Sequence, residues 1–484
     1  MNNENADVTT EKPKRIHDEA PSDLFANFMK SGWTPSNLGD LPPLEVVTYA
    51  FTRRQVLSEA FKGIRLVLPA GGYKVRANDT DYNYRPHSAY VYYSGVQGAD
   101  ATAEAVLVLE PSGDSHITYL YMNPRSTRDT DAFYRDAKYG ELWVGRRFTL
   151  DEAKARYQIE TRHLSELAGL LSDNKETLTL RSVDQLVDKS VKTHAREEEF
   201  ATFVSEQRLC KDGYEIAELQ AAVDASALGF NDVVAAIPAA VETPRGERVL
   251  DAAFYGRARI LGNDLGYNTI VGAGSHACVL HWIRNDGDVH RGELVLVDAG
   301  VEMQSFYTAD ITRTLPVDGK FSPAQRALYM LVYESQLAGF AAIKPGVLFS
   351  EINKACQEVL AKGLADMGVL TVSAEESLKP EVGLHRRWTL HGVSHHLGLD
   401  VHDCAQARKE MYLDSPLREG MVLTVEPGLY IQPDDELFAP EYRGIGIRIE
   451  DDVVVTADGC RNLSEDIPRH PDDIEKWMKR ILGR

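Results

Sequence analysis

The stretch LVDAGVEMQSFYTADITRT, residues 296–314, places one aspartate in each of two short apolar runs that flank a polar middle. Apolar, β-branched runs joined in this way predict a β-hairpin. With Gln304 at the centre of the turn, Asp298 would lie opposite Asp310, with about 4.5–5.5 Å between their Cβ atoms. Two buried carboxylates at that distance are costly unless they are paired or bind a metal. The stretch alone leaves two interpretations open: a solvated polar hairpin, or a hairpin that holds metal ions, as in two-metal hydrolytic sites.

The composition is that of an acidic globular protein. A chain of 484 residues exceeds what one core usually covers, so two domains are expected. The formal net charge of −20 argues against nucleic-acid and anionic-membrane partners. The five cysteines are scattered without a CxxC motif, which argues against a disulfide framework or a zinc knuckle. The sequence has no recognisable secretory signal and no apolar run of membrane-spanning length, so we expect a cytoplasmic protein that binds neither nucleic acid nor membrane.

The order of apolar and polar segments divides the chain into three parts. Residues 1–44 are polar and predict a mobile tail with a short helix at 23–31. Residues 45–205 alternate strands with helices and predict an α/β domain, whereas residues 206–484 contain runs of strands separated by helix pairs and predict an α+β domain. The expected strands are 64–72, 89–95, 103–110, 117–123, 267–274, 277–282, 293–300, 305–317, 421–431 and 444–456. The expected helices are 51–61, 149–171, 208–237, 324–343 and 349–368.

Four carboxylates occupy strand positions that a core would fill with apolar residues. Besides Asp298 and Asp310, Glu426 interrupts MVLTVEPGLYI and Glu450 ends GIGIRIE. A lone core glutamate can pair with an arginine, and Arg448 is nearby. The strands do not carry enough cations to pair all four, however, and an unpaired buried charge is strongly unfavourable. Two divalent cations would balance the four negative charges, which favours a metal site.

Several histidines accompany these carboxylates. His281 closes ACVLH, and LHGVSHHLGLDVHD contains His391, His395, His396 and His402. A single histidine in an apolar stretch is more often a core residue than a ligand. Four carboxylates completed by one neutral imidazole form a set that suits Mn²⁺, Co²⁺, Fe²⁺ or Zn²⁺. The other histidines would then carry protons and stabilise an oxyanion.

Four motifs in this order, VDAG…ADITRT, HGVSHHLGLDVHD, LTVEPGLY and GIGIRIED, resemble those of the pita-bread metallopeptidases, which include methionine aminopeptidase, prolidase and aminopeptidase P. The resemblance covers most of residues 205–465. It implies an α+β pita-bread catalytic domain preceded by a smaller α/β domain. It also implies two divalent metal ions, with Mn²⁺ as the first choice and Co²⁺ or Zn²⁺ as alternatives, and hydrolysis by a hydroxide held between them.

The same resemblance implies a role for each matching residue. The expected metal ligands are Asp298, Asp310, His395, Glu426 and Glu450, with Glu426 also as general base. The other expected residues are His281 and His391 at the substrate and oxyanion, His402 near the leaving proline, and Arg448 in substrate binding. His396 is expected to point away. The family has one residue fewer between its two aspartates, so the extra residue should lie in the VEMQSFY turn or in a bulge.

The N-terminal half narrows the choice within the family. YRPHSAYVYYSG, AEAVLVLE and the later EYRGIGIRIEDDVVVT resemble aminopeptidase P. This resemblance implies release of the N-terminal residue from peptides with proline in the second position, by a homodimer or homotetramer. Two alternatives remain open: a prolidase, which acts only on Xaa-Pro dipeptides, and a pita-bread binding protein without catalysis. The second alternative is disfavoured because such proteins lack several of the five ligands.

Overall fold

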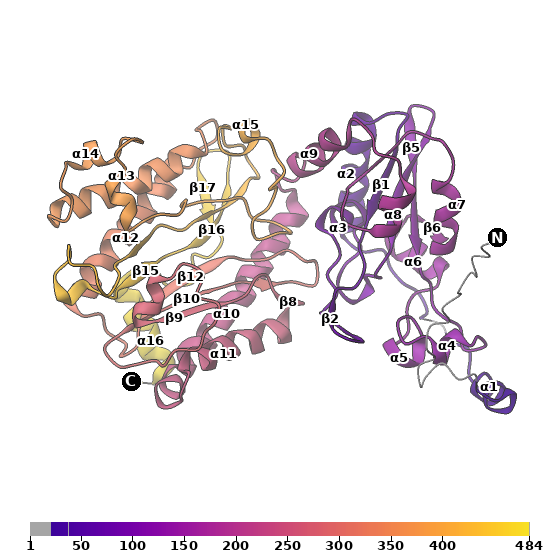
Figure 1. The fold of residues 1–484 in the computed structure, drawn as a ribbon, viewed down its shortest axis with the longest axis horizontal. Helices are drawn as coiled ribbons and strands as arrows, with labels where there is room; N and C mark the ends of the chain where they lie inside the picture. The colour runs from indigo at the N-terminus through magenta and orange to yellow at the C-terminus, as the bar shows by residue number, and fades with distance from the viewer. Residues whose placement is uncertain (1–20, 37, 484) are drawn as a thin grey trace, which may run out of the picture.

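The structure, a computed structural model, describes residues 21–36 and 38–483. It has two parts, with the N-terminal part at the right of Figure 1 and the C-terminal part at the left. Residues 1–20 of the predicted tail lie outside the described residues, and α1 (Asp23–Met29) occupies the position predicted for its short helix. The boundaries at residues 44 and 205 stay predictions.

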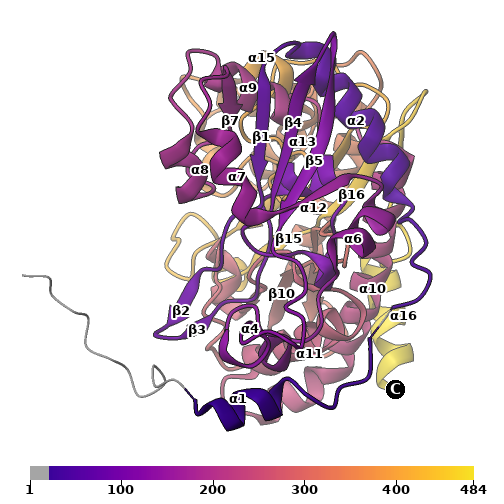
Figure 2. The same ribbon diagram turned by 90° about the vertical axis from the view of Figure 1, so that its right-hand side faces the viewer.

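The N-terminal part is built on a mixed sheet in the order β6-β5-β4-β1-β7, whose middle strands β1, β4 and β5 run side by side in Figure 2. Successive residues of a strand point to opposite faces. Leu66 and Leu68 therefore join the main core, whereas Val67 packs on the other face. The strands are β1 (Arg65–Pro69), β4 (Val106–Ser112), β5 (Ser115–Met122), β6 (Glu160–His163) and β7 (Thr177–Thr179). The helices of this part and of the link to the next are α2 (Val46–Ala60), α3 (Ser88–Ser94), α6 (Leu150–Tyr157), α7 (Leu167–Leu171), α8 (Gln185–Ser190) and α9 (Glu197–Glu206).

The strand predicted at 89–95 is wrong, because these residues belong to helix α3. His87 caps the helix by accepting a hydrogen bond from the Ala89 N–H, and Gly95 ends it at φ 73°. All seven residues of α3 are buried. The sequence therefore lacks the polar face from which a helix is usually recognised.

The single helix predicted at 149–171 is also wrong. Thr149 and Glu152 form a capping box that starts α6, and Gln158 ends it in the left-handed conformation at φ 53°. The chain then forms β6, which pairs in parallel with β5, before α7 begins. The apolar residues of α6, β6 and α7 together have the spacing expected of one longer helix, which is why the sequence predicted one.

The C-terminal part contains the same arrangement twice: a helix pair followed by a three-stranded antiparallel sheet. Helices α10 (Gly213–Glu242) and α11 (Gly246–Leu261) precede the sheet β12-β10-β9, and α12 (Pro323–Ala342) and α13 (Ser350–Asp366) precede the sheet β13-β16-β17. The strands are β9 (Ile270–Ala273), β10 (Leu294–Ala299), β12 (Ile311–Pro316), β13 (Val422–Val425), β16 (Asp451–Val455) and β17 (Cys460–Asn462). Two-stranded pairs join β8 (Asp264–Leu265) to β11 (Val301–Glu302) and β14 (Gly428–Tyr430) to β15 (Gly446–Arg448). The last helix is α16 (Pro471–Leu482).

The remaining elements are short. They are β2 (Val75–Ala77), β3 (Thr80–Asp81), α4 (Ala132–Arg135), α5 (Glu141–Val144), α14 (Ala374–Ser377) and α15 (Lys409–Tyr412). Residues 277–282 do not form the predicted strand, since a 3₁₀ turn at Gly274–Cys278 leads into a loop. Ala277 and Cys278 are buried against a small apolar cluster, so their character reflects packing and not pairing. Among the described residues, no helix combines the length and the apolar character needed to cross a membrane.

Candidate metal centre

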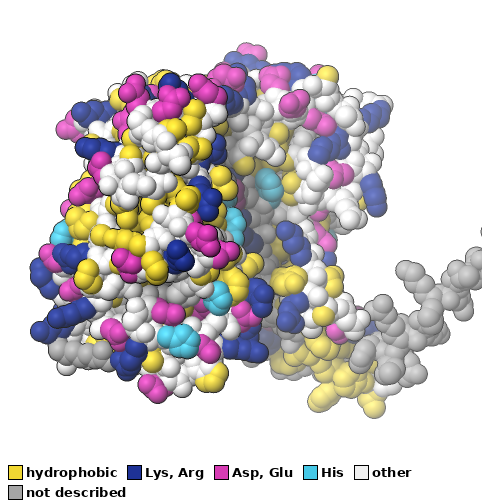
Figure 3. All heavy atoms as spheres, turned by 60° about the vertical axis from the view of Figure 1, so that its left-hand side comes forward, with side chains coloured by type: hydrophobic (Ala, Val, Ile, Leu, Met, Phe, Trp, Pro, Cys, Tyr) yellow, Lys and Arg dark blue, Asp and Glu magenta, His cyan; other side chains and the backbone are white. Residues whose placement is uncertain are grey.

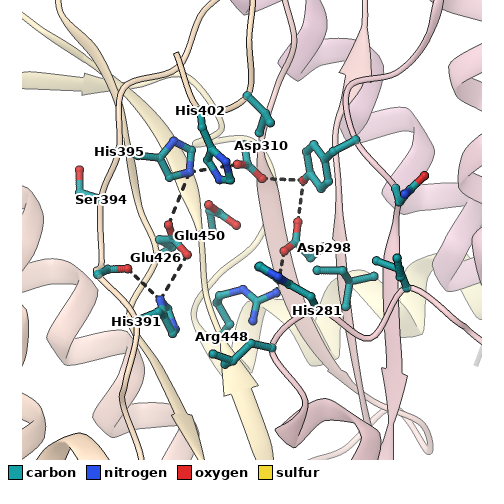
Figure 4. Close-up of a pocket in the computed structure, with 17 residues that line it drawn as sticks. His281, Asp298, Asp310, His391, Ser394, His395, His402, Glu426, Arg448 and Glu450 are labelled. Atoms are coloured by element: carbon teal, nitrogen blue, oxygen red, sulfur yellow. Dashed lines mark hydrogen bonds and ion pairs between the residues drawn. The ribbon is translucent and has the colours of Figure 1, made fainter. Parts of the chain in front are cut away.

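One pocket of about 580 Å³ gathers all nine residues predicted for the site (Figure 4). Asp298 lies on β10, Asp310 directly precedes β12, and Glu426 and Glu450 sit at the ends of strands in the second half. Figure 3 shows the surface hollowed between the two parts of the molecule, with histidine side chains near the edge of the hollow. The nine residues are His281, Asp298, Asp310, His391, His395, His402, Glu426, Arg448 and Glu450.

The alternation of β10 explains why a buried strand presents a carboxylate. Val295 and Val297 belong to the main core, which includes Phe254 of α11. Leu296 belongs to a separate cluster beneath the pocket, and Asp298 follows it on the same face. One face of β10 thus packs into the core, and the other face presents the Asp298 carboxylate to the pocket.

The predicted facing of Asp298 and Asp310 is wrong. Asp298 pairs with Thr312, so Asp310 is its diagonal neighbour on the same face. The turn is centred one residue later than predicted, and its end is closed by a 2.9 Å hydrogen bond from the Met303 N–H to the Tyr307 carbonyl oxygen. A shift of one residue in the turn centre moves every partner by two positions.

The hairpin between the aspartates pairs without a bulge, so an extra residue, as expected from the family, would lie in the turn. The pairing keeps one register from Leu294–Pro316 to the isolated bridge between Glu302 and Thr308. Within the turn, Phe306 adopts φ 69°, a conformation that is uncommon for a residue with a side chain.

A tyrosine that sequence reasoning missed joins the two aspartates. The Tyr267 hydroxyl oxygen lies 2.6 Å from Asp298 Oδ1 and 2.5 Å from Asp310 Oδ1. A hydroxyl has one proton to donate, so it satisfies one carboxylate at a time, and the other needs a proton or a cation. Burial, reinforced by both aspartates, raises the pKa of Tyr267 well above its ordinary value and keeps the donor protonated. No local pattern in YNTIVGAG signals this contact, because it depends on how the chain before β9 crosses β10.

His395 stands between two carboxylates. Its Nε2 lies 3.3 Å from Asp310 Oδ2 and 3.5 Å from Glu426 Oε1. Burial disfavours the charged ring, but these carboxylates outweigh it and raise the pKa of His395 to about 9. Asp310, His395 and Glu450 each offer a ligand atom, and the three atoms lie within 4.8 Å of one another. A metal ion in that space would take the place of the proton on His395.

The two glutamates are buried in the same pocket. Burial raises the pKa of Glu426 to about 7 and that of Glu450 well above its ordinary value, and Asp310 adds to both effects. Thr312 Oγ1 donates a 2.6 Å hydrogen bond to Glu450 Oε2. The sequence holds a signal for Thr312, since it lies two residues after Asp310 and so shares its face.

Arg448 is buried and engaged with protein groups. One guanidinium nitrogen donates to Asp298 Oδ2 at 2.6 Å, and another donates to the Tyr430 hydroxyl at 3.0 Å. Arg448 therefore positions Asp298, and its contact with a substrate stays a prediction.

His391 continues this chain of hydrogen bonds. Its Nδ1 lies 2.8 Å from the Gly392 carbonyl oxygen and its Nε2 lies 2.7 Å from the Tyr430 hydroxyl. A carbonyl only accepts, so Nδ1 carries the proton and Nε2 accepts from Tyr430. Burial lowers the pKa of His391 to about 4, which keeps the ring neutral.

The other histidines separate into two groups. The His402 ring meets the His395 ring edge-on, 4.6 Å away, and His281 lines the opposite wall of the pocket. His396 is buried outside the pocket, stacked on Phe349 with 5.3 Å between ring centroids. The expectation that His396 points away therefore agrees with the structure.

The charges of the pocket fit divalent cations. The four carboxylates are balanced by the Arg448 guanidinium and, when it is protonated, by the His395 imidazole. These two groups are fewer than the carboxylates, so negative charge is in excess in a buried space. Oxygen-rich donors with one histidine suit Mn²⁺, Co²⁺, Fe²⁺ or Zn²⁺. A cleft of this kind between two sheets, lined by histidines outside the ligand set, defines a metal-dependent hydrolase.

Comparison with known proteins agrees with this class. Residues 217–457 match metallopeptidase family M24, and residues 50–180 match the aminopeptidase P N-terminal domain. Xaa-Pro aminopeptidase 1 of Streptomyces coelicolor is 48% identical over 466 residues, covering 96% of this chain and 93% of the relative. Xaa-Pro aminopeptidase of Escherichia coli is 34% identical over 450 residues, covering 88% and 96%. The chain belongs to the aminopeptidase P branch of metallopeptidase family M24.

A solved structure supports the fold. Aminopeptidase P from E. coli with the inhibitor Pro-Leu superposes on this structure with a TM-score of 0.79 at 31% sequence identity. The match covers 91% of this chain and 100% of the E. coli chain. The expected α+β pita-bread domain with a smaller N-terminal α/β domain is thereby confirmed.

Proposed function

We propose that this protein releases the N-terminal residue from peptides that have proline in the second position, with two divalent ions, Mn²⁺ first among them. The observation that carries the proposal is the meeting of Asp298, Asp310, His395, Glu426 and Glu450 in one pocket of a chain from the aminopeptidase P branch. Bound ions would polarise the scissile carbonyl and lower the pKa of a water molecule.

The chain's own residues would handle the protons. Glu426 lies in the pocket as a carboxylate beside His395 and would act as general base toward the water molecule. The hydrogen bonds from Arg448 through Tyr430 would fix the His391 ring for contact with the substrate. His281 would meet the developing oxyanion, and His402 the proline side of the broken bond.

The shape of the pocket supports the specificity for proline. The bond before proline is a tertiary amide without an N–H, so recognition must rely on the ring and not on that donor. Apolar side chains of Ile270, Leu280, Ile283 and Val401 line the pocket beside the charged cluster and would pack against the ring.

Peptide assays on metal-analysed protein test this function against the prolidase alternative. We expect cleavage of Xaa-Pro-Yaa, little cleavage of Xaa-Ala-Yaa, and none when the N-terminus is acetylated. Equal turnover of the proline and alanine tripeptides would overturn the specificity. Cleavage of the dipeptide Xaa-Pro alone would assign the protein as a prolidase.

We also propose a homodimer or homotetramer in the cytoplasm. Apolar side chains gather on the surface of the N-terminal part (Figure 3), and large exposed patches of this kind mark protein contacts. They include Leu24, Phe28, Leu142 and Trp143. All five cysteines, each within the described part of the chain, are free thiols, as expected in a reducing compartment. Mass photometry that finds a fully active monomer would contradict the assembly.

A further inference from the structure

The N-terminal part of the chain contacts two segments next to the pocket through Arg85, just before α3. Its Nε donates a 2.6 Å hydrogen bond to Glu302 Oε2 on β11, and another nitrogen donates to the Leu399 carbonyl oxygen. A third nitrogen bonds the Ser88 hydroxyl at 3.0 Å. One guanidinium therefore ties its own helix to two separate segments of the C-terminal part, the hairpin before Asp310 and the loop at 397–404.

The loop at 397–404 carries His402, and its acidic residues are held by the N-terminal part and by the segment between α9 and α10. The Ser88 hydroxyl donates a 2.5 Å hydrogen bond to Asp400 Oδ1, and Arg208 in the link after α9 donates to Asp400 Oδ2 at 2.6 Å. Arg208 and Lys211 together pair with the buried Asp403. His402 is thus flanked on both sides by residues that the N-terminal part and the link immobilise.

The loop and the hairpin are also bonded to each other. The Thr308 N–H of the hairpin donates to the Gly398 carbonyl oxygen of the loop at 3.2 Å, and the loop is closed on itself by the Asp403 N–H, which donates to the His396 carbonyl oxygen at 2.9 Å. Arg85 lies at the point where these segments meet, with its guanidinium carbon 5.7 Å from the centre of the Phe306 ring. Its planar, five-donor head can satisfy all these acceptors at once, which a lysine ammonium cannot do with the same geometry.

We propose that Arg85 is a positioning residue for the peptidase reaction: through Glu302 and Leu399 it holds the hairpin and the 397–404 loop in register, and so places His402 against His395. The proposal rests on the proposed function for its effect on rate, but the contacts themselves are independent of it. A group displaced by about 1 Å from its productive geometry costs roughly 10²-fold in rate. The N-terminal domain would then complete the active site of its own chain, whatever its part in assembly.

Arg128 offers a matched control. Its Nε pairs with the buried Glu141 at 3.1 Å, and its side chain is 33% exposed, as is that of Arg85. Its aromatic neighbours, Trp33 and Phe133, belong to the N-terminal part. R128A therefore removes an arginine–glutamate pair of similar exposure without touching the loop or the hairpin, although Glu141 keeps Arg125 as a second partner.

The test compares full-length wild type, R85A, R85K, S88A and R128A at equal metal content. We expect R85A to lower kcat by about 10- to 100-fold on an Xaa-Pro-Yaa peptide, with KM changed by less than about threefold. R85K should recover part of this loss, S88A should show a smaller loss in the same direction, and R128A should match wild type. Equal kcat for R85A and R128A would overturn the proposal, as would a loss in R85A that follows loss of metal.

Hydrogen exchange gives a second readout that needs no substrate. R85A should exchange faster than wild type and R128A at residues 302–308 and 397–404, with the rest of the C-terminal sheets unchanged. Unchanged protection of these segments in R85A would overturn the positioning role even if the variant were slow. A wild-type protein that cleaves no Xaa-Pro peptide would instead refute the proposed function, and exchange would still decide whether Arg85 holds the loop.

Discussion

The hydroxyl of Thr312 lies 2.6 Å from the carboxylate of Glu450. A residue of β12, in the first sheet of the C-terminal part, therefore donates a hydrogen bond to a glutamate next to β16, in the second sheet. The Thr312 hydroxyl oxygen also accepts a hydrogen bond from Arg448 Nε at 3.1 Å. Asp298 sits directly across the strand pair from this threonine. One small side chain therefore links both sheets at the centre of the pocket.

Replacing Thr312 by valine keeps the volume and removes both hydrogen bonds. We expect T312V to fold and to lose about 10- to 100-fold in activity, the usual cost of losing a partner that orients a ligand. T312S keeps the hydroxyl and should stay close to wild type. Steady-state kinetics at saturating metal would measure the activity of both variants. A wild-type rate in T312V would show that the Thr312 hydroxyl does not orient Glu450 for the reaction.

Loss of the Tyr267 hydroxyl should weaken metal binding. In Y267F the two aspartates lose the donor that they share, so Asp310 is held less firmly, whereas Asp298 keeps its hydrogen bond from Arg448. We expect metal affinity to fall by about 10- to 100-fold in a fluorescence or calorimetric titration. Y84F, which removes a buried hydroxyl bonded to the Gly71 carbonyl oxygen in the N-terminal part, is the control. Equal affinity in Y267F and Y84F would contradict the role given to Tyr267.

Chelation should abolish activity, and Mn²⁺ or Co²⁺ should restore it. The metal-loaded form should also be more stable, by about 2.7 kcal/mol when free metal is 100 times Kd, because only the folded chain gathers the ligands. Thermal melts and elemental analysis on the same samples check both effects. Full activity in protein verified to be metal-free would refute the metal site.

The sequence predicted the long elements and the candidate ligands because their signals are local. The apolar periods of α10, α12 and α13 are long enough to be unambiguous, and the carboxylates stand out in apolar strands. The predicted pairing of Asp298 was wrong because register depends on the turn, which includes Phe306 at an uncommon positive φ. The helix α3 was mistaken for a strand because it is buried on every side. Tyr267 and Arg85 gave no signal, since tertiary contacts alone bring them to the site.

Acid should destabilise the protein partly through His87. Burial, and then the nearby Arg208 cation, lower its pKa to about 4, and its Nδ1 accepts the Ala89 N–H, which only the unprotonated nitrogen can do. His87 takes up a proton near pH 6.5 in the unfolded chain and only near pH 4 in the folded chain. His87 therefore contributes full stability above pH 6.5, and about 3 kcal/mol of it is lost as the pH falls from 6.5 to 4.

Urea unfolding at pH 7.5 and 4.5 checks this expectation. H87N keeps a capping acceptor but does not titrate in this range, so it should lose less stability than wild type between the two values. The control is the same substitution at His163, an exposed histidine whose Nδ1 caps a 3₁₀ turn. An identical pH slope in H87N and wild type would contradict the assignment.

Gly300 should tolerate no side chain. A Cβ atom there would lie 1.7 Å from the Ala309 carbonyl oxygen across the hairpin. G300A should therefore push the strand that leads to Asp310 away and cost several kcal/mol of stability, about 2–4. Gly256 in α11 has open space around it, so G256A should stabilise slightly through helix propensity. Calorimetric melting points that rank G300A at or above wild type would contradict this steric argument.

The five proposed ligands are spread over about 150 residues of the chain, from Asp298 to Glu450. With this distribution, a chain interrupted anywhere before residue 450 lacks at least one ligand. Products that end between residues 316 and 450 would carry the hairpin and its aspartates but no complete site. Peptidase competence would therefore require the chain to be continuous through both halves of the catalytic part, and the order of the ligands along the sequence would keep shorter products inert toward peptides.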